Sequence, residues 1–116
     1  MNVVIDYGNS SAKVGIFDHQ HLTEKRTFTS AESLQSFLEN HTFENFIISS
    51  VNADAGTVTA WAHATNKYIL THSLPLPISI GYRTPHTLGV DRIAAACGGA
   101  LLFPKTNRLT IDAGTC

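Results

Sequence analysis

The 116-residue sequence has almost no net charge and few cysteines, and each of these features argues against a class of protein. Charged residues make up 15% of the chain and leave a net charge of −1 with histidine neutral. This balance gives no reason to expect a nucleic-acid partner or an anionic membrane surface. The two cysteines, Cys97 and Cys116, form neither a CxxC motif nor a metal-ligand set. We therefore expect free thiols in a reducing, cytoplasmic protein.

Long apolar runs are also missing. No run approaches the length of a membrane span, and Met1-Asn2 lacks the basic region of a signal peptide. The hydrophobic fraction is nevertheless 43%, which is ordinary for a globular protein and unlike a disordered one. A chain of this length forms one domain at most and can bury a real core.

The spacing of apolar residues predicts a mixed α/β order of elements. Turn residues stand at Gly8-Asn9-Ser10 and at Asp18-His19-Gln20, and Ser30 offers a helix N-cap before Leu34, Phe37 and Leu38 at helical spacing. The predicted strands are 2–6, 12–17, 21–28, 46–49, 67–71 and 108–112, and further helices are predicted at 53–65 and 93–103. An antiparallel three-strand meander, extended by parallel strands and flanking helices, is a ribonuclease-H-like α/β domain.

The first candidate site follows the first predicted strand. It consists of Asp6, Tyr7, Gly8, Asn9, Ser10, Ser11, Ala12 and Lys13. A hairpin turn of glycine and small polar residues exposes backbone N–H groups that can hold a phosphate. Lys13 adds a positive charge, and Asp6 can hold a hydrated magnesium ion. The alternative is a simple hairpin turn, and the motif alone favours that alternative.

A second short element, Asp112-Ala113-Gly114-Thr115, repeats the order of the first: strand, Asp, Gly and a hydroxyl residue. A turn after a buried strand would explain it equally well when it is taken alone. Its resemblance to the first element favours a phosphate clamp with one such turn in each half.

The third element, Gly89-Val90-Asp91-Arg92, stands at the start of a predicted helix. Asp91 could accept a proton from a substrate hydroxyl, and the forked guanidinium of Arg92 suits a substrate carboxylate. In isolation a simpler interpretation is favoured, in which Asp91 stabilises the helix dipole and Arg92 is solvated. Cys97 in the following small-residue helix is interpreted as a small buried hydrophobe and not as a nucleophile.

Taken together, these residues resemble type III pantothenate kinases, members of the acetate/sugar kinase, heat-shock chaperone and actin superfamily. The matching motifs are D-x-G-N-[ST]-x-x-K at Asp6–Lys13, G-x-D-R at Gly89–Arg92 and D-x-G-T at Asp112–Thr115. Tyr82 stands where the family has a substrate-contacting tyrosine. Order and spacing agree over the whole chain, which corresponds to about the first half of a family member.

The resemblance implies a role for each motif. Asp6–Lys13 would bind the phosphates of ATP, with magnesium accompanying the nucleotide. Asp91 would be the proton acceptor for the pantothenate hydroxyl, while Tyr82 and Gly89–Arg92 contact pantothenate. Asp112 would bind a monovalent cation (potassium or ammonium), and Thr115 would touch ATP. These expectations describe ATP-dependent formation of 4'-phosphopantothenate, the first step of coenzyme A biosynthesis.

The resemblance also implies that residues 1–116 form the N-terminal lobe of a two-lobe kinase that is a homodimer at full length. We expect this lobe to be inactive without a C-terminal lobe. Two alternatives stay open. One is a half-domain of a sugar kinase or polyphosphatase, against which Tyr82 and Gly89–Arg92 argue. The other is a non-enzymatic transcription accessory or partner-binding protein on the same fold.

Overall fold

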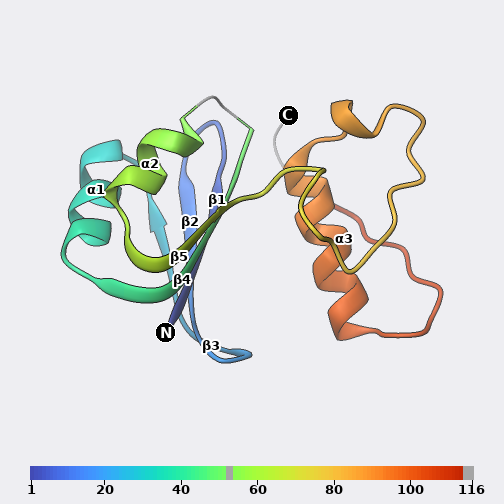
Figure 1. Cartoon of the computed structure of the whole chain (residues 1–116), viewed down its shortest axis with the longest axis horizontal. Coiled ribbons are helices and arrows are strands. Elements are labelled where there is room, and N and C mark those ends of the chain that lie inside the picture. The colour runs from blue at the N-terminus through green and yellow to red at the C-terminus, as the bar shows by residue number, and fades with distance from the viewer. Residues whose placement is uncertain (52–53, 114–116) are drawn as a thin grey trace. The chain divides into compact units, whose positions relative to one another are not determined.

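The computed structural model describes residues 1–51 and 54–113 and divides the chain into two compact units, Met1–Leu70 and Thr71–Cys116 (Figure 1). The first unit holds a five-stranded sheet with helices α1 and α2. The second holds helix α3 and a short 3-10 helix, η1 (Pro85–Thr87). That residues 1–116 make one lobe of a larger kinase stays a prediction.

The sheet of the first unit has the order β3-β2-β1-β4-β5. Its strands are β1 (Asn2–Tyr7), β2 (Ala12–Asp18), β3 (His21–Phe28), β4 (Thr42–Ser50) and β5 (His63–Ile69). The first three strands are antiparallel neighbours, whereas β4 pairs parallel with β1 and β5 pairs parallel with β4. This topology confirms the predicted α/β fold, a meander extended by parallel strands.

Helices α1 (Ala31–Glu39) and α2 (Ala55–Trp61) lie on the same side of the sheet (Figure 1). Alternate strand residues face them and are buried, as expected for a sheet with one covered face. Leu34, Phe37 and Leu38 supply the apolar face of α1. Ser30 is its N-cap, as predicted, and accepts a hydrogen bond from Ser33 N at 3.3 Å. Such a cap contributes about 1 kcal/mol.

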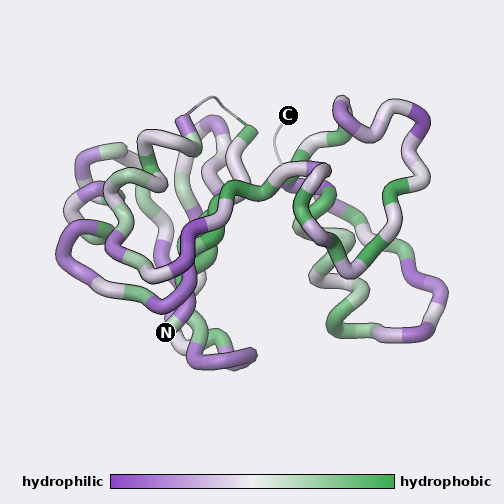
Figure 2. Tube along the Cα trace, viewed as in Figure 1, coloured by the Kyte–Doolittle hydropathy of each residue, from purple (hydrophilic) through white to green (hydrophobic). Residues whose placement is uncertain are grey.

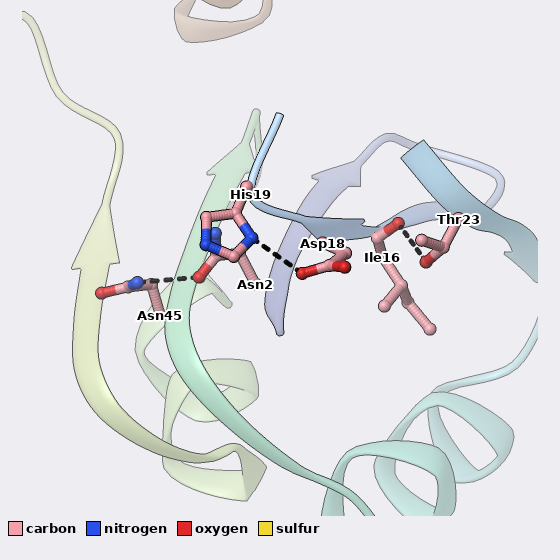
Figure 3. A network of polar contacts seen from close by, with 6 residues as sticks. All are labelled: Asn2, Ile16, Asp18, His19, Thr23 and Asn45. Atoms are coloured by element: carbon pink, nitrogen blue, oxygen red, sulfur yellow. Dashed lines mark hydrogen bonds and ion pairs between the residues drawn. The ribbon is translucent and has the colours of Figure 1, made fainter. Parts of the chain in front are cut away.

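The opposite face of the sheet carries a ladder of three asparagines. Asn66 Nδ2 donates to Asn45 Oδ1 at 2.9 Å. Asn45 Nδ2 in turn donates to Asn2 Oδ1 at 2.7 Å (Figure 3). These residues are register partners on β1, β4 and β5. The ladder therefore fixes the pairing of the three strands by side-chain bonds as well as backbone bonds.

Strand β3 forms one edge of the sheet, and its turn from β2 is hydrophilic (Figure 2). A bulge interrupts the β2–β3 ladder between Ile16 and Phe17. There Thr23 Oγ1 donates to the Ile16 carbonyl oxygen at 3.0 Å (Figure 3). A polar, bulged edge of this kind discourages pairing with other chains.

Three predicted boundaries in the first unit were wrong. The helix predicted at 53–65 ends at Trp61, because residues 63–65 begin β5 and pair with β4; residue 53 lies outside the described residues. Strand β5 accordingly spans His63–Ile69, where 67–71 was predicted. Strand β4 begins at Thr42, four residues before the predicted start. In each case parallel pairing with a distant strand decided the boundary.

The second unit is built on α3 (Val90–Leu102), a helix of mostly apolar and small residues (Figure 2). It begins three residues before the predicted start, with Gly89 at its N-cap position. The predicted strand at 108–112 was wrong: the described part of this segment has no strand pairing, and Leu109 and Ile111 are 86% and 77% exposed. Among the described helices, none has the length and apolar character needed to span a bilayer.

Candidate active site

The first candidate site is the hairpin between β1 and β2. Gly8 N donates to the Ser11 carbonyl oxygen at 3.0 Å and closes the turn. Gly8 has no positive φ, and a β-carbon there would meet the Ser11 carbonyl oxygen at an ordinary 3.5 Å. The protein's own packing therefore gives no reason for glycine at this position. Close approach of a ligand to the backbone is a reason that remains.

Asp6 and Lys13 are direct register partners on β1 and β2, at the base of this hairpin. Both are exposed, and both face away from the core because their neighbours Ile5 and Val14 are buried in it. Neither side chain forms an ion pair or hydrogen bond with the described part of the chain. A carboxylate and an ammonium thus stand side by side at the hairpin, each able to take an external partner.

A hollow of about 150 Å³ lies beside the hairpin, within the first unit. Residues 7–12 form one wall, and residues 28–31 with Asp54 form the other. Thr29 and Ser30 bring hydroxyl groups to it from the start of α1. The sequence interpretation missed this second wall, since it treated Ser30 only as a cap. Antiparallel return of β3 along β2, which brings Phe28 opposite Ala12, is the signal that predicts it.

The second candidate site is the start of α3. Asp91 is partly buried in the first turn, and its Oδ1 accepts a hydrogen bond from Arg92 N at 2.9 Å. This contact fits the simpler interpretation of Asp91 as a helix-start carboxylate. Oδ2 of Asp91 has no hydrogen bond within the described residues. The Arg92 side chain is exposed and likewise makes no ion pair with them.

Tyr82 lies before η1 and is 52% exposed. No hydrogen bond joins it to Gly89–Arg92 within the described part of the second unit. Asp112 is exposed at the end of the described chain, and its neighbours Gly114 and Thr115 lie outside the described residues, as does Cys116. The structure therefore brings Asp6 and Lys13 together at one hairpin, and Gly89, Val90, Asp91 and Arg92 together at one helix start.

The described residues offer few side chains for holding a metal ion. In residues 1–51 and 54–113, no three His, Cys, Asp or Glu side chains gather into a metal site. A magnesium ion held by one or two carboxylates and phosphate oxygens needs no such cluster.

Cys97, a free cysteine of α3, is partly buried, and desolvation by burial raises the pKa of its thiol. That shift agrees with an unreactive thiol.

The model of the family described as type III pantothenate kinase matches residues 2–116. The chain is 40% identical over 116 residues to a type III pantothenate kinase of Cytophaga hutchinsonii, covering 100% of this chain and 49% of that protein. It is 38% identical over 120 residues to one of Phocaeicola vulgatus, and 33% identical over 121 residues to one of Flavobacterium johnsoniae. In both cases 100% of this chain covers 50% of the relative.

The chain thus spans about half the length of the curated relatives it matches. The motifs that carry the resemblance in the sequence lie inside the matched range. Both the mixed five-stranded sheet and the matched residues agree with it, and the chain belongs to the type III pantothenate kinase family.

Proposed function

We propose that this chain supplies the phosphate-binding hairpin and the acceptor-binding helix start of an enzyme that phosphorylates pantothenate with ATP. The product is 4'-phosphopantothenate, which begins coenzyme A biosynthesis. The observation that carries the proposal is the family match over residues 2–116. Support comes from Asp6 and Lys13, two exposed and unpaired charges at the hairpin base.

The hairpin handles the phosphates. Backbone N–H groups of Gly8 to Ala12 and the Lys13 ammonium hold the ATP phosphates, while Asp6 holds the magnesium ion that accompanies them. The exposed Asp6 carboxylate fits that ion, because magnesium prefers few carboxylates and several waters. In phosphoryl transfer the protein contributes mainly by positioning the reacting groups and by stabilising the phosphate charge, and these residues can do both.

The helix start handles the acceptor. Oδ1 of Asp91 is used by Arg92 N, so Oδ2 is the atom that accepts the proton of the pantothenate hydroxyl. The Arg92 guanidinium pairs with the pantothenate carboxylate, and Tyr82, Gly89 and Val90 line the rest of that site. We further propose that Asp112 binds a monovalent cation, potassium or ammonium, that Thr115 touches ATP, and that the enzyme acts as a homodimer.

The proposal is tested with a joined protein, made by fusing this chain to the C-terminal half of the Cytophaga hutchinsonii relative, which the chain does not cover. We expect the joined protein to consume ATP only when pantothenate is present and to release 4'-phosphopantothenate, detected by mass spectrometry. The chain alone is expected to show no turnover. Circular dichroism and a melting curve establish that each protein is folded.

The matched control is the joined protein carrying Asp91→Asn, which should be folded and nearly inactive. A folded joined protein that forms no phosphopantothenate, or phosphorylates a sugar instead, would overturn the proposal. Turnover by the 116-residue chain alone would overturn the expectation that the C-terminal half is needed for activity.

A further inference from the structure

Ser49 Oγ is the one buried side-chain nitrogen or oxygen atom in the described chain that lacks a hydrogen-bond partner. Ser49 stands near the end of β4 and is only 7% exposed. Buried hydroxyl groups are nearly always hydrogen-bonded, so an unpaired one calls for an explanation. The fold gains nothing from it, since an alanine or valine would occupy the same strand position without the cost of desolvating a hydroxyl.

The register of the sheet places Ser49 beside Asp6. Asp6 pairs with Lys13 on β2 and with Ser49 on β4, so the three residues form one row across the sheet. Side chains of register partners lie on the same face, and neighbouring strands are about 4.7–4.9 Å apart. Since Ile5 and Ile48 precede Asp6 and Ser49 and are buried in the core, the row belongs to the face away from α1 and α2.

Repulsion from Lys13 would determine on which side of Asp6 a divalent cation binds. The Lys13 ammonium flanks Asp6 on one side and repels a second cation, while Ser49 flanks it on the other side and is neutral. Carboxylates that ligate metals are commonly held by a hydrogen bond to their second oxygen. A buried hydroxyl next to Asp6 is suited to provide that bond.

We propose that Ser49 is the positioning residue of the Asp6 metal site. Its hydroxyl donates to one Asp6 oxygen when magnesium and phosphate bind, and the other Asp6 oxygen is turned to the hydrated ion on the side away from Lys13. The inference rests on the proposed function, because it requires that Asp6 holds the metal that accompanies ATP. It explains why the hydroxyl has no partner without a ligand.

The test measures how much magnesium strengthens binding of a non-hydrolysable ATP analogue to the 116-residue chain. Amide NMR shifts of residues 8–12 give the dissociation constant in excess magnesium and in EDTA, and the ratio of the two is the metal-linked gain. Ser49→Ala should lower this gain about tenfold. Ser49→Thr, which keeps the hydroxyl, should preserve it, and Ser49→Cys, which keeps the volume but is a weak donor, should resemble Ser49→Ala.

A purely structural role would change both dissociation constants alike and leave the gain unaltered. In a double-mutant cycle, Ser49→Ala should have no further effect once Asp6→Ala is present, because Ser49 acts through Asp6. The matched control is Thr27→Val. Thr27 is the register partner of Lys13 on β3, in the same row but beyond Lys13, and its loss should leave the gain intact.

The outcomes separate the two proposals. If neither the wild-type chain nor the joined protein shows a gain, or if Asp6→Ala leaves the gain unchanged, the proposed phosphate and metal site is wrong and the inference about Ser49 is wrong with it. If Asp6→Ala abolishes the gain while Ser49→Ala and Ser49→Cys keep it, the inference about Ser49 alone is overturned. Melting curves without ligand show whether any variant is unfolded, in which case the remaining two Ser49 variants decide.

Discussion

The Asp91 carboxylate folds back over Gly89, so closely that a β-carbon built on Gly89 would lie 2.5 Å from Asp91 Oδ1. No real side chain tolerates that distance. The atom that would have to move is the end of the Asp91 side chain and not the backbone. A glycine at position 89 therefore permits the present orientation of Asp91.

Gly89→Ala should consequently displace the Asp91 carboxylate without unfolding the helix. In the joined protein we expect kcat to fall by about 10- to 100-fold, the scale of a misplaced catalytic group. The free energy of unfolding should change by about 1 kcal/mol or less, the scale of a cap change. Steady-state kinetics and urea denaturation measure the two effects. Gly81→Ala, where a β-carbon would meet nothing within 4 Å, is the matched control and should leave both unchanged.

Asp91→Asn tests the proton acceptor itself. The amide oxygen of asparagine can still accept the hydrogen bond from Arg92 N, so the helix start should persist. Loss of the proton acceptor should lower kcat by about 10²- to 10⁴-fold in the joined protein, with little change in pantothenate binding. Near-normal turnover would leave Asp91 with its helix-start role alone.

Asp6→Ala and Arg92→Ala should affect different substrates. Asp6→Ala removes the proposed magnesium ligand and should raise the KM for Mg-ATP, whereas Arg92→Ala should mainly raise the KM for pantothenate, each by about tenfold or more. Varying one substrate at saturating levels of the other separates the two effects. Equal losses for both substrates in both variants, with unchanged melting curves, would show that the roles were assigned wrongly.

Neighbouring glycines of α3 provide a matched pair for stability. A β-carbon on Gly98 would meet nothing within 4 Å, so Gly98→Ala should stabilise the chain by about 1 kcal/mol through helix propensity. A β-carbon on Gly99 would lie 2.9 Å from Thr110 Oγ1. Gly99→Ala should therefore lose that gain and end about 1–2 kcal/mol below Gly98→Ala. Urea denaturation checks the difference, and equal stabilities would mean that residues 108–110 do not pack on α3.

Cys97 should react slowly with iodoacetamide at neutral pH, because burial raises the pKa of its thiol and the thiolate is the nucleophile. The same shift favours the protonated thiol in the folded chain, so its contribution to stability is lost as the pH rises through the folded pKa. In a Cys116→Ser chain, the alkylation rate of Cys97 should increase on adding urea. Equal rates in the folded and unfolded chain would contradict this.

Much of the first unit could be predicted because local signals decide it. The range of β3 agrees with the strand predicted at 21–28, which the turn residues Asp18-His19-Gln20 precede, and the start of α1 agrees with the Ser30 cap. Residues 63–65 were misassigned because their propensities are weak and their strand state depends on pairing with Thr42 and Phe43, some twenty residues earlier. Pairing over such distances leaves no local trace in the sequence.

The candidate site divides in the same way. Adjacent motif residues such as Asp6 and Lys13 could be placed on one hairpin from the turn between them. Ser49 could not be found without the strand order, because it reaches the hairpin through the parallel pairing of β4 with β1. The wall formed by residues 28–31 was missed although the predicted meander implies it, since β3 returns along β2 and brings Phe28 opposite Ala12. A strand was predicted before Asp112 only because the apolar residues Leu109 and Ile111 alternate with polar ones. Both side chains are exposed, so this alternation alone does not establish a strand.

The asparagine ladder has a direction. Each amide group donates toward β1, from Asn66 to Asn45 and from Asn45 to Asn2. Deamidation would therefore act differently at each rung. At Asn45 it would replace a donor by a carboxylate oxygen facing Asn2 Oδ1, two acceptors in contact, while the bond from Asn66 would become charge-assisted. Deamidation of this one side chain would therefore weaken the pairing of β1 with β4 and strengthen the pairing of β4 with β5.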